Sequence, residues 1–321
     1  MMDTAAELAR RLLARERPAL ARAISWAENA DARFASALAE VYARVGRAWR
    51  IRITGPPGAG KSSLVNALIE LLRARNETVG VLAVDPSSPF SGGALLGDRI
   101  RMEERTTDPG VYIRSMATRS SRGGLARAAV DALDVMDAFG FDWLLAETVG
   151  VGQTEYEIAG AADTVLVVLC PGAGDGIQAM KAGLLEVADV LVVNKCDLPG
   201  ADQLQNDLEE ALQLRALSRH KTRARMPAVV AVSAHSGVGL ERLLAAVTAH
   251  RGELAGEALA SVRAEKRLNQ VRRVVAERLD EALWASGENR VRAALWLREA
   301  RTPHDVADEL FRALLGSTRT E

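Results

Sequence analysis

The hydrophobic pattern changes character twice along this chain of 321 residues. Residues 5–47 place leucine, alanine, valine and tryptophan among arginine and glutamate at helical spacing, interrupted near Pro18, which predicts two or three helices. After about residue 240 the pattern is helical again, with Gly287 and Pro303 as breaks. Between these regions short β-rich runs alternate with helical segments: WRIRIT, TVGVLAVD, VYIRS, DWLLAET, DTVLVVLC, DVLVVNK and AVVAVSA.

Most of these central runs show little polar alternation, which suits parallel strands that are covered on both faces and joined by right-handed helical crossovers. The fold class predicted is α/β, with a doubly wound, mostly parallel sheet between two helical extensions. We place an N-terminal helical extension at 1–47, the α/β domain at 48–252 and a C-terminal helical arm at 253–321.

Composition narrows the class of protein. Hydrophobic residues make up 48% of the chain, enough for a large core, and no apolar run is long enough for a membrane helix. The 41 basic and 42 acidic residues nearly cancel, which argues against nucleic acid or a membrane surface as a partner. The N-terminus lacks the charged-then-apolar order of a secretory signal. Cys170 and Cys196 fall in or beside predicted core strands, which suits buried thiols in a reducing compartment. We therefore expect a cytoplasmic protein.

Residues 55–63, GPPGAGKSS, match the phosphate-binding pattern G-x-x-x-x-G-K-S between a predicted strand and a helix that begins near Lys61. Glycines let the backbone wrap around phosphate, Lys61 reaches the β- and γ-phosphates, and Ser62 ligates magnesium. The alternative is a glycine-rich turn that only opens a helix. The residues predicted to hold the phosphates are Gly55, Pro56, Pro57, Gly58, Ala59, Gly60, Lys61, Ser62 and Ser63.

The sequence NKCD at 194–197 follows a predicted strand, at the edge where open α/β sheets bind ligands. The Asp197 carboxylate can accept the N1–H and 2-amino hydrogens of guanine, whereas adenine offers neither donor. Asn194 can engage the other edge of the base, and Lys195 can lie along it. We also assign the segment Ser233, Ala234 and His235 to this pocket, where backbone amides can reach the guanine carbonyl. The alternative for NKCD is an ordinary polar turn.

The segment ETVGVGQ at 147–153 ends another predicted strand where GTPases usually carry D-x-x-G. Glu147 would contact magnesium through water, and the Gly150 amide would sense the γ-phosphate. Val151 occupies the position where Ras-like proteins place a water-positioning glutamine. Gln153 lies two positions further on, and we do not assign that role to it. We therefore expect weak hydrolysis unless other side chains or a partner complete the site.

Three further polar residues are candidates for the same edge of the sheet. Asp85 and Asp98 could bind magnesium or orient water, although either could simply cap a turn or a helix. Lys181, on a helix after the loop PGAGDG, could swing toward the phosphates or could be an ordinary solvated lysine.

Together these motifs make the chain resemble the MeaB/ArgK family of P-loop GTPases in the SIMIBI class, the chaperones associated with methylmalonyl-CoA mutase. The resemblance covers roughly residues 5–315 and rests on GPPGAGKSS, VLAVDPSSPFSGGALLGDRIRM, IRSMATRSSRGGLA, ETVGVGQTE, PGAGDGIQAMKAG, VVNKCD and VSAHSGVGL. It implies a homodimer that binds GTP or GDP with Mg²⁺ and dimerises through its C-terminal arm.

The resemblance also implies roles for individual residues. The matching positions Asp85, Asp98 and Glu147 would surround the magnesium and the γ-phosphate, together with Ser62, and Lys181 would lie on a mobile third switch loop. The catalytic set would then comprise Lys61, Asp98, Glu147 and Lys181. The implied function is to gate adenosylcobalamin delivery to an acyl-CoA mutase and to release damaged cobalamin, the identity of the mutase remaining open.

Three other functions stay open at this point. A nickel-insertion GTPase needs clustered thiolates and imidazoles, whereas the histidines here are scattered at 220, 235, 250 and 304. A nucleotide-dependent scaffold would bind a partner with negligible turnover. A small-molecule kinase matches an older label of the family, but it requires an acceptor pocket that the sequence does not identify, and NKCD argues against ATP.

Overall fold

The computed structural model describes residues 3–85, 107–117, 122–148, 160–172, 184–218 and 226–317. The chain divides into two compact units, Met1–Ala255 and Gly256–Glu321, which we call the sheet unit and the C-terminal unit. No helix in the described ranges is both long and apolar enough to span a membrane.

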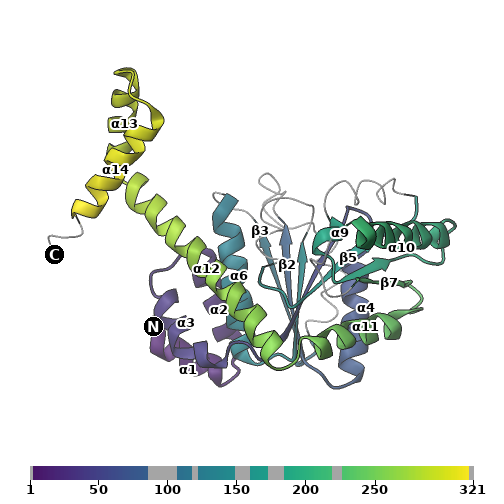
Figure 1. The fold of residues 1–321 in the computed structure, drawn as a ribbon. Coiled ribbons are helices and arrows are strands. Elements are labelled where there is room, and N and C mark those ends of the chain that lie inside the picture. The colour runs from purple at the N-terminus through teal and green to yellow at the C-terminus, as the bar shows by residue number, and fades with distance from the viewer. Residues whose placement is uncertain are drawn as a thin grey trace. The chain divides into compact units, whose positions relative to one another are not determined.

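The sheet unit is built on seven parallel strands in the order β3-β2-β4-β1-β5-β6-β7 (Figure 1). The strands are β1 (Trp49–Thr54), β2 (Val79–Asp85), β3 (Val111–Ala117), β4 (Trp143–Thr148), β5 (Thr164–Leu169), β6 (Val190–Val193) and β7 (Ala228–Ala231). The predicted α/β fold is therefore confirmed. In this order β4, β2 and β3 lie on one side of β1, and β5, β6 and β7 lie on the other, so the strand order reverses beside β1. Ligands of such sheets bind at the carboxyl ends of the strands next to this reversal.

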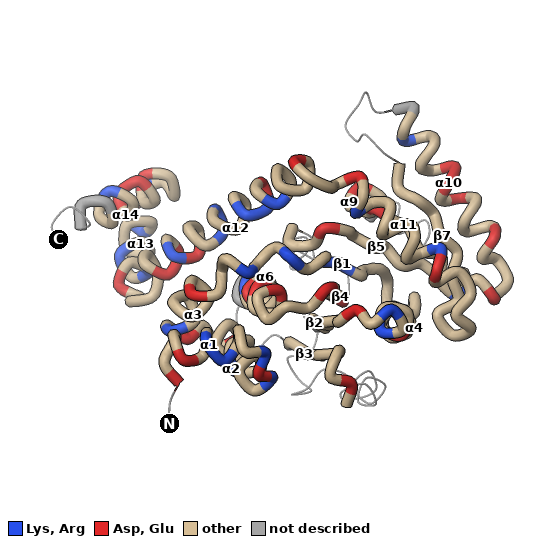
Figure 2. Tube along the Cα trace, turned by 90° about the horizontal axis from the view of Figure 1, so that it is seen from below, with Lys and Arg blue, Asp and Glu red and all other residues tan. Residues whose placement is uncertain are grey.

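Burial explains the continuous apolar runs of the sequence. Every residue of β1, β4, β5 and β6 is buried. The strands carry few charged residues, whereas the helix α10 (Ala201–Ser218) carries several acidic ones (Figure 2). The other helices in the described part of this unit are α1 (Ala5–Leu13), α2 (Arg17–Glu28), α3 (Phe34–Val41), a 3₁₀ turn at Tyr42–Arg44, α4 (Lys61–Ala74), α6 (Arg122–Phe139), α9 (Leu184–Val187) and α11 (Leu240–Glu253).

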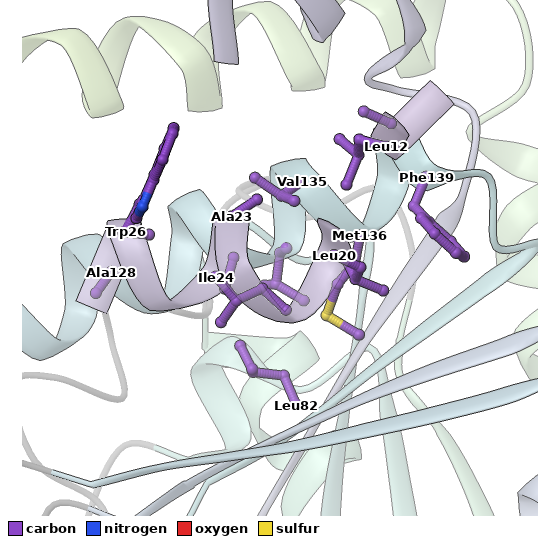
Figure 3. Close-up of a cluster of buried hydrophobic side chains, with 14 of the residues drawn as sticks. Leu12, Leu20, Ala23, Ile24, Trp26, Leu82, Ala128, Val135, Met136 and Phe139 are labelled. Carbon is purple, nitrogen blue, oxygen red and sulfur yellow. The ribbon is translucent and has the colours of Figure 1, made fainter. Parts of the chain in front are cut away.

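The N-terminal helices share one hydrophobic core with the sheet. Leu12, Leu20 and Ile24 pack with Met136 of α6 and Leu82 of β2 (Figure 3). The break predicted near Pro18 is the first turn of α2, where proline's missing N–H and fixed φ do no harm. The helical segment before β1 is thus part of the sheet unit's packing.

A buried ion cluster ties α6 to β1. Nη2 of Arg50 lies 2.8 Å from Oδ1 of Asp134 and 2.7 Å from Oδ2 of Asp137, and all three side chains are buried. Asp137 also accepts the backbone N–H groups of residues 46–48, just before β1. Burial alone would lower the pKa of Arg50, but the two carboxylates outweigh it and raise that pKa, so the guanidinium stays charged. The start of β1, the strand that leads into residues 55–63, is therefore fixed.

Candidate nucleotide-binding site

The loop at 55–60 joins the end of β1 to the start of α4, the strand–loop–helix setting that the motif predicts. Gly55 has φ +143°, and a Cβ there would lie 2.0 Å from the carbonyl oxygen of Val168. Gly60 has φ +86°, and a Cβ there would lie 2.4 Å from Nδ2 of Asn194. Both positions require glycine, because any side chain would collide with a neighbouring strand or with the segment after β6.

Three side chains donate hydrogen bonds to five carbonyl oxygens of this loop, those of Gly55, Pro56, Gly58, Ala59 and Gly60. Nζ of Lys61 lies 2.9 Å from the first two, and Nζ of Lys195 lies 2.8 Å from the third. Nδ2 of Asn194 lies 2.9 and 3.3 Å from the last two. Carbonyl oxygens would repel a phosphate, so holding them with donors makes the loop suitable for an anion.

Ser62 and Glu147 bring two oxygen ligands together beside the loop. Oγ of Ser62, in the first turn of α4, donates a hydrogen bond of 2.6 Å to Oε1 of Glu147 near the end of β4. Glu147 is only 5% exposed, and it pairs with Ile53 of β1 and Ala83 of β2 in the sheet register. A hydroxyl and a carboxylate in contact are the oxygen donors that Mg²⁺ prefers, so the residues present fit this cation.

Other residues predicted for this end of the site are only partly described. Asp85 is the last residue of β2, at the same edge of the sheet as Glu147, and its side chain lies outside the described part. Asp98, Gly150 and Lys181 fall outside the described residues.

Asn194 links the phosphate loop to the segment after β7. Its side chain is 1% exposed, and its Oδ1 accepts the backbone N–H of Ala234 at 3.1 Å while its Nδ2 donates to the loop carbonyls. These hydrogen bonds give Asn194 protein partners on both sides, and its contact with the base stays a prediction. The pattern N-K-x-D could not reveal them because the carbonyls lie 134 and 135 positions away in the chain.

Asp197 presents an exposed carboxylate next to this link. Its pKa is lowered mainly by a hydrogen bond from the Ser233 side chain, then by a backbone N–H, with smaller contributions from the charges of His235 and Lys195. The carboxylate is therefore ionised at neutral pH and acts only as an acceptor. Ser233 is 1% exposed, so this contact holds the carboxylate in place. The sequence placed Ser233 in the pocket, but nothing in its pattern revealed the contact with Asp197.

The predicted motifs thus meet at one edge of the sheet. The phosphate loop follows β1, Glu147 ends β4, residues 194–197 follow β6 and residues 233–235 follow β7. The arrangement can bind a polyphosphate at one end and a base with adjacent hydrogen-bond donors at the other. Pro57 in the loop and Ser63 in the first turn of α4 are exposed. The thiol of Cys170, which the sequence placed in or beside a core strand but not in this site, lies 3.9 Å from the Gly58 carbonyl oxygen.

The phosphate loop lies between β1 and α4, and the hydrogen-bond acceptor Asp197 follows β6 of the same parallel sheet. This arrangement defines a P-loop GTPase. The family model described as "Methylmalonyl Co-A mutase-associated GTPase MeaB" matches residues 20–288, and the chain belongs to this family. The resemblance seen in the sequence is therefore confirmed.

Relatives and a solved structure agree with this assignment. A protein of Pyrococcus abyssi is 41% identical over 315 residues, which are 97% of each chain. "GTPase ArgK" of Escherichia coli is 33% identical over 291 residues, covering 88% of this chain and 87% of that protein. The mouse "Methylmalonic aciduria type A homolog, mitochondrial" is 38% identical over 198 residues, 61% of this chain and 47% of that protein. A structure titled "LAO/AO transport system kinase" superposes with a TM-score of 0.72 at 26% identity, covering 98% of this chain and 99% of its own.

Proposed function

We propose that this GTPase uses magnesium and GTP to gate the loading, protection and release of adenosylcobalamin in a cobalamin-dependent acyl-CoA mutase. One observation supports the nucleotide part of this proposal. The ionised carboxylate of Asp197 lies three residues after Asn194, and the Asn194 side chain is hydrogen-bonded to the phosphate loop. Base and phosphates are thereby held by one connected set of side chains. The mutase part is supported by the family description and by the name of the mouse relative.

In this proposal each described residue has a defined task. Lys61 would hold the β- and γ-phosphates with two of its three ammonium hydrogens and keep one of its bonds to the loop carbonyls, and Ser62 and Glu147 would hold the metal. Magnesium, when bound, would neutralise negative charge on the phosphate oxygens. Glu147 needs no large movement for this role, because it already contacts Ser62.

The sequence motifs extend the proposal to four more residues. Asp85 and Asp98 would complete the metal and water contacts, the Gly150 amide would sense the γ-phosphate, and Lys181 would complete the catalytic site. Turnover would then be slow until the bound mutase completes the catalytic site.

We also propose that the protein is a homodimer through the C-terminal unit. This unit contains α12 (Glu257–Trp284), α13 (Glu288–Arg298) and α14 (Pro303–Ser317), and its core consists of Leu283, Ala293, Val306 and Leu310 with Trp296 and Leu314 packed against them. That core is small for 66 residues.

The helix α12 supplies the surface for a second copy. Leu268, Val271 and Val275 are 51%, 56% and 50% exposed, and their spacing of three and four residues puts them on one face. Charges of both signs line the same helix (Figure 2), so two copies could pair opposite charges beside this apolar stripe.

Titrating the GTPase rate with mutase tests the proposed function. The rate at saturating GTP should rise with added methylmalonyl-CoA mutase, or with another cobalamin-dependent acyl-CoA mutase, because the partner completes the site. The Lys181→Ala variant should keep the GTP affinity of the wild type and lose most of this acceleration. An acyl-CoA enzyme that does not use cobalamin serves as the control.

Two outcomes of this titration count against the proposal. An unchanged rate with every cobalamin-dependent acyl-CoA mutase would favour a scaffold with negligible turnover. Full acceleration of the Lys181→Ala variant would return Lys181 to the role of a solvated lysine.

A further inference from the structure

The last residue of β4 carries a buried hydroxyl that the nucleotide-binding motifs do not use. Thr148 is 1% exposed, and its Oγ1 has no hydrogen-bond partner among the described residues. A buried hydroxyl without a partner loses its hydration and gains nothing in return. Valine has the same shape and would avoid this penalty, so the hydroxyl calls for an explanation.

The position of Thr148 places it at the ligand-binding edge of the sheet. It pairs with Val84 of β2 and directly follows Glu147, whose partner in β1 is Ile53. Thr148 is therefore level with Thr54, the last residue of β1 before the phosphate loop. Alternation along the strand puts it on the opposite face from Glu147, the face that also carries Ala146 of the core.

The chemistry of a threonine hydroxyl matches the shell of a magnesium–nucleotide complex. Mg²⁺ keeps several water molecules when it binds phosphates, and those waters donate and accept hydrogen bonds. A hydroxyl can do both as well. The polar side chains described beside the phosphate loop, Ser62 and Lys61, already have partners: Ser62 bonds to Glu147, and Lys61 bonds to loop carbonyls.

We propose that Thr148 is a positioning residue for the magnesium–nucleotide complex, whose hydroxyl gains its hydrogen bond from the water around that complex. The inference rests on the proposed magnesium site. Two residues at the end of β4 would then act on the complex. Glu147 would hold the metal from one face of the sheet, and Thr148 would hydrogen-bond the surrounding water from the other face.

The Thr148→Val variant should behave differently in the nucleotide-free protein and in the magnesium–nucleotide complex. Without nucleotide its unfolding midpoint should equal or exceed that of the wild type, because no hydrogen bond is lost there. With Mg²⁺ its affinity for GDP and for a non-hydrolysable GTP analogue should fall about fivefold to tenfold, the worth of one hydrogen bond. In excess EDTA its GDP affinity should match that of the wild type, and Thr148→Ser should restore the magnesium-dependent affinity.

Thr164→Val is the matched control. Thr164 is also buried, on β5, but its Oγ1 lies 3.0 Å from Nε1 of Trp49 and 2.9 Å from Nδ1 of His250. Its valine variant should lower the unfolding midpoint and leave nucleotide affinity unchanged.

Three results of these measurements would contradict a positioning role for Thr148. A lowered midpoint for nucleotide-free Thr148→Val, or a GDP affinity equal to that of the wild type in Mg²⁺, would overturn the role of Thr148. An affinity loss of the same size in EDTA would do so as well. If the wild-type protein itself failed to bind GDP, the proposed function would fail first, so the two failures are distinguishable.

Discussion

Replacing Asp197 with asparagine should move the base preference of this protein from guanine to xanthine. The Asp197 carboxylate is ionised at neutral pH, as an aspartate whose pKa is lowered by a hydrogen bond from Ser233 must be, so it accepts hydrogen bonds and rejects bases that offer no donor. An asparagine amide offers a donor that suits the 2-carbonyl of xanthine. Sites built to pair specific polar groups discriminate by about 10⁴–10⁵, and most of that preference for GDP over XDP should be lost.

Competition between GDP, XDP and ADP for the purified variant measures this change. Asp202→Asn is a matched control, because Asp202 is an exposed aspartate in the first turn of α10, five positions further along the chain. It should bind GDP like the wild type. An unchanged preference for GDP in Asp197→Asn would remove Asp197 from the base pocket.

The second large effect is expected for Lys61→Ala, which should weaken GDP and GTP binding by about 10²–10⁴-fold. A hydrogen bond to a charged group contributes about 1.5–3 kcal/mol, and Lys61 would make two such contacts with the phosphates. The substitution also leaves the carbonyl oxygens of Gly55 and Pro56 without their ammonium donor, which makes the loop less favourable for an anion.

Equilibrium binding of a fluorescent GDP derivative, with the GTPase rate alongside, would measure this loss. Arg75→Ala is a suitable control because Arg75 lies at the other end of the same helix, in an exposed ion pair with Glu241. A Lys61→Ala protein that bound GDP and turned over GTP normally would contradict the assignment of residues 55–63.

The sequence was sufficient to predict the elements that local chemistry determines. The apolar runs that become β4, β5 and β6 predicted buried parallel strands, and the glycines around Lys61 predicted the loop between β1 and α4. These patterns work because burial on both faces and positive φ angles each restrict the residues that fit.

Contacts between distant segments could not be predicted in the same way. WRIRIT reads as an alternating strand, yet Arg50 is buried, and its partners Asp134 and Asp137 lie 84 and 87 positions later. Helical periodicity in residues 5–47 indicates an apolar face but not that α6 covers it. Such pairings depend on how the chain folds back, which the local spacing of residues does not encode.

The central claim is that one edge of the sheet holds a magnesium polyphosphate and a guanine base together. A crystal structure of the wild-type protein with Mg²⁺ and GDP, or a non-hydrolysable GTP analogue, tests it most directly. We predict phosphates in the loop at 55–63, the metal at Ser62 and Glu147, and the guanine edge at Asp197 beside residues 233–235. A structure with the purine remote from residues 194–197, or with the phosphates bound elsewhere, would contradict the account.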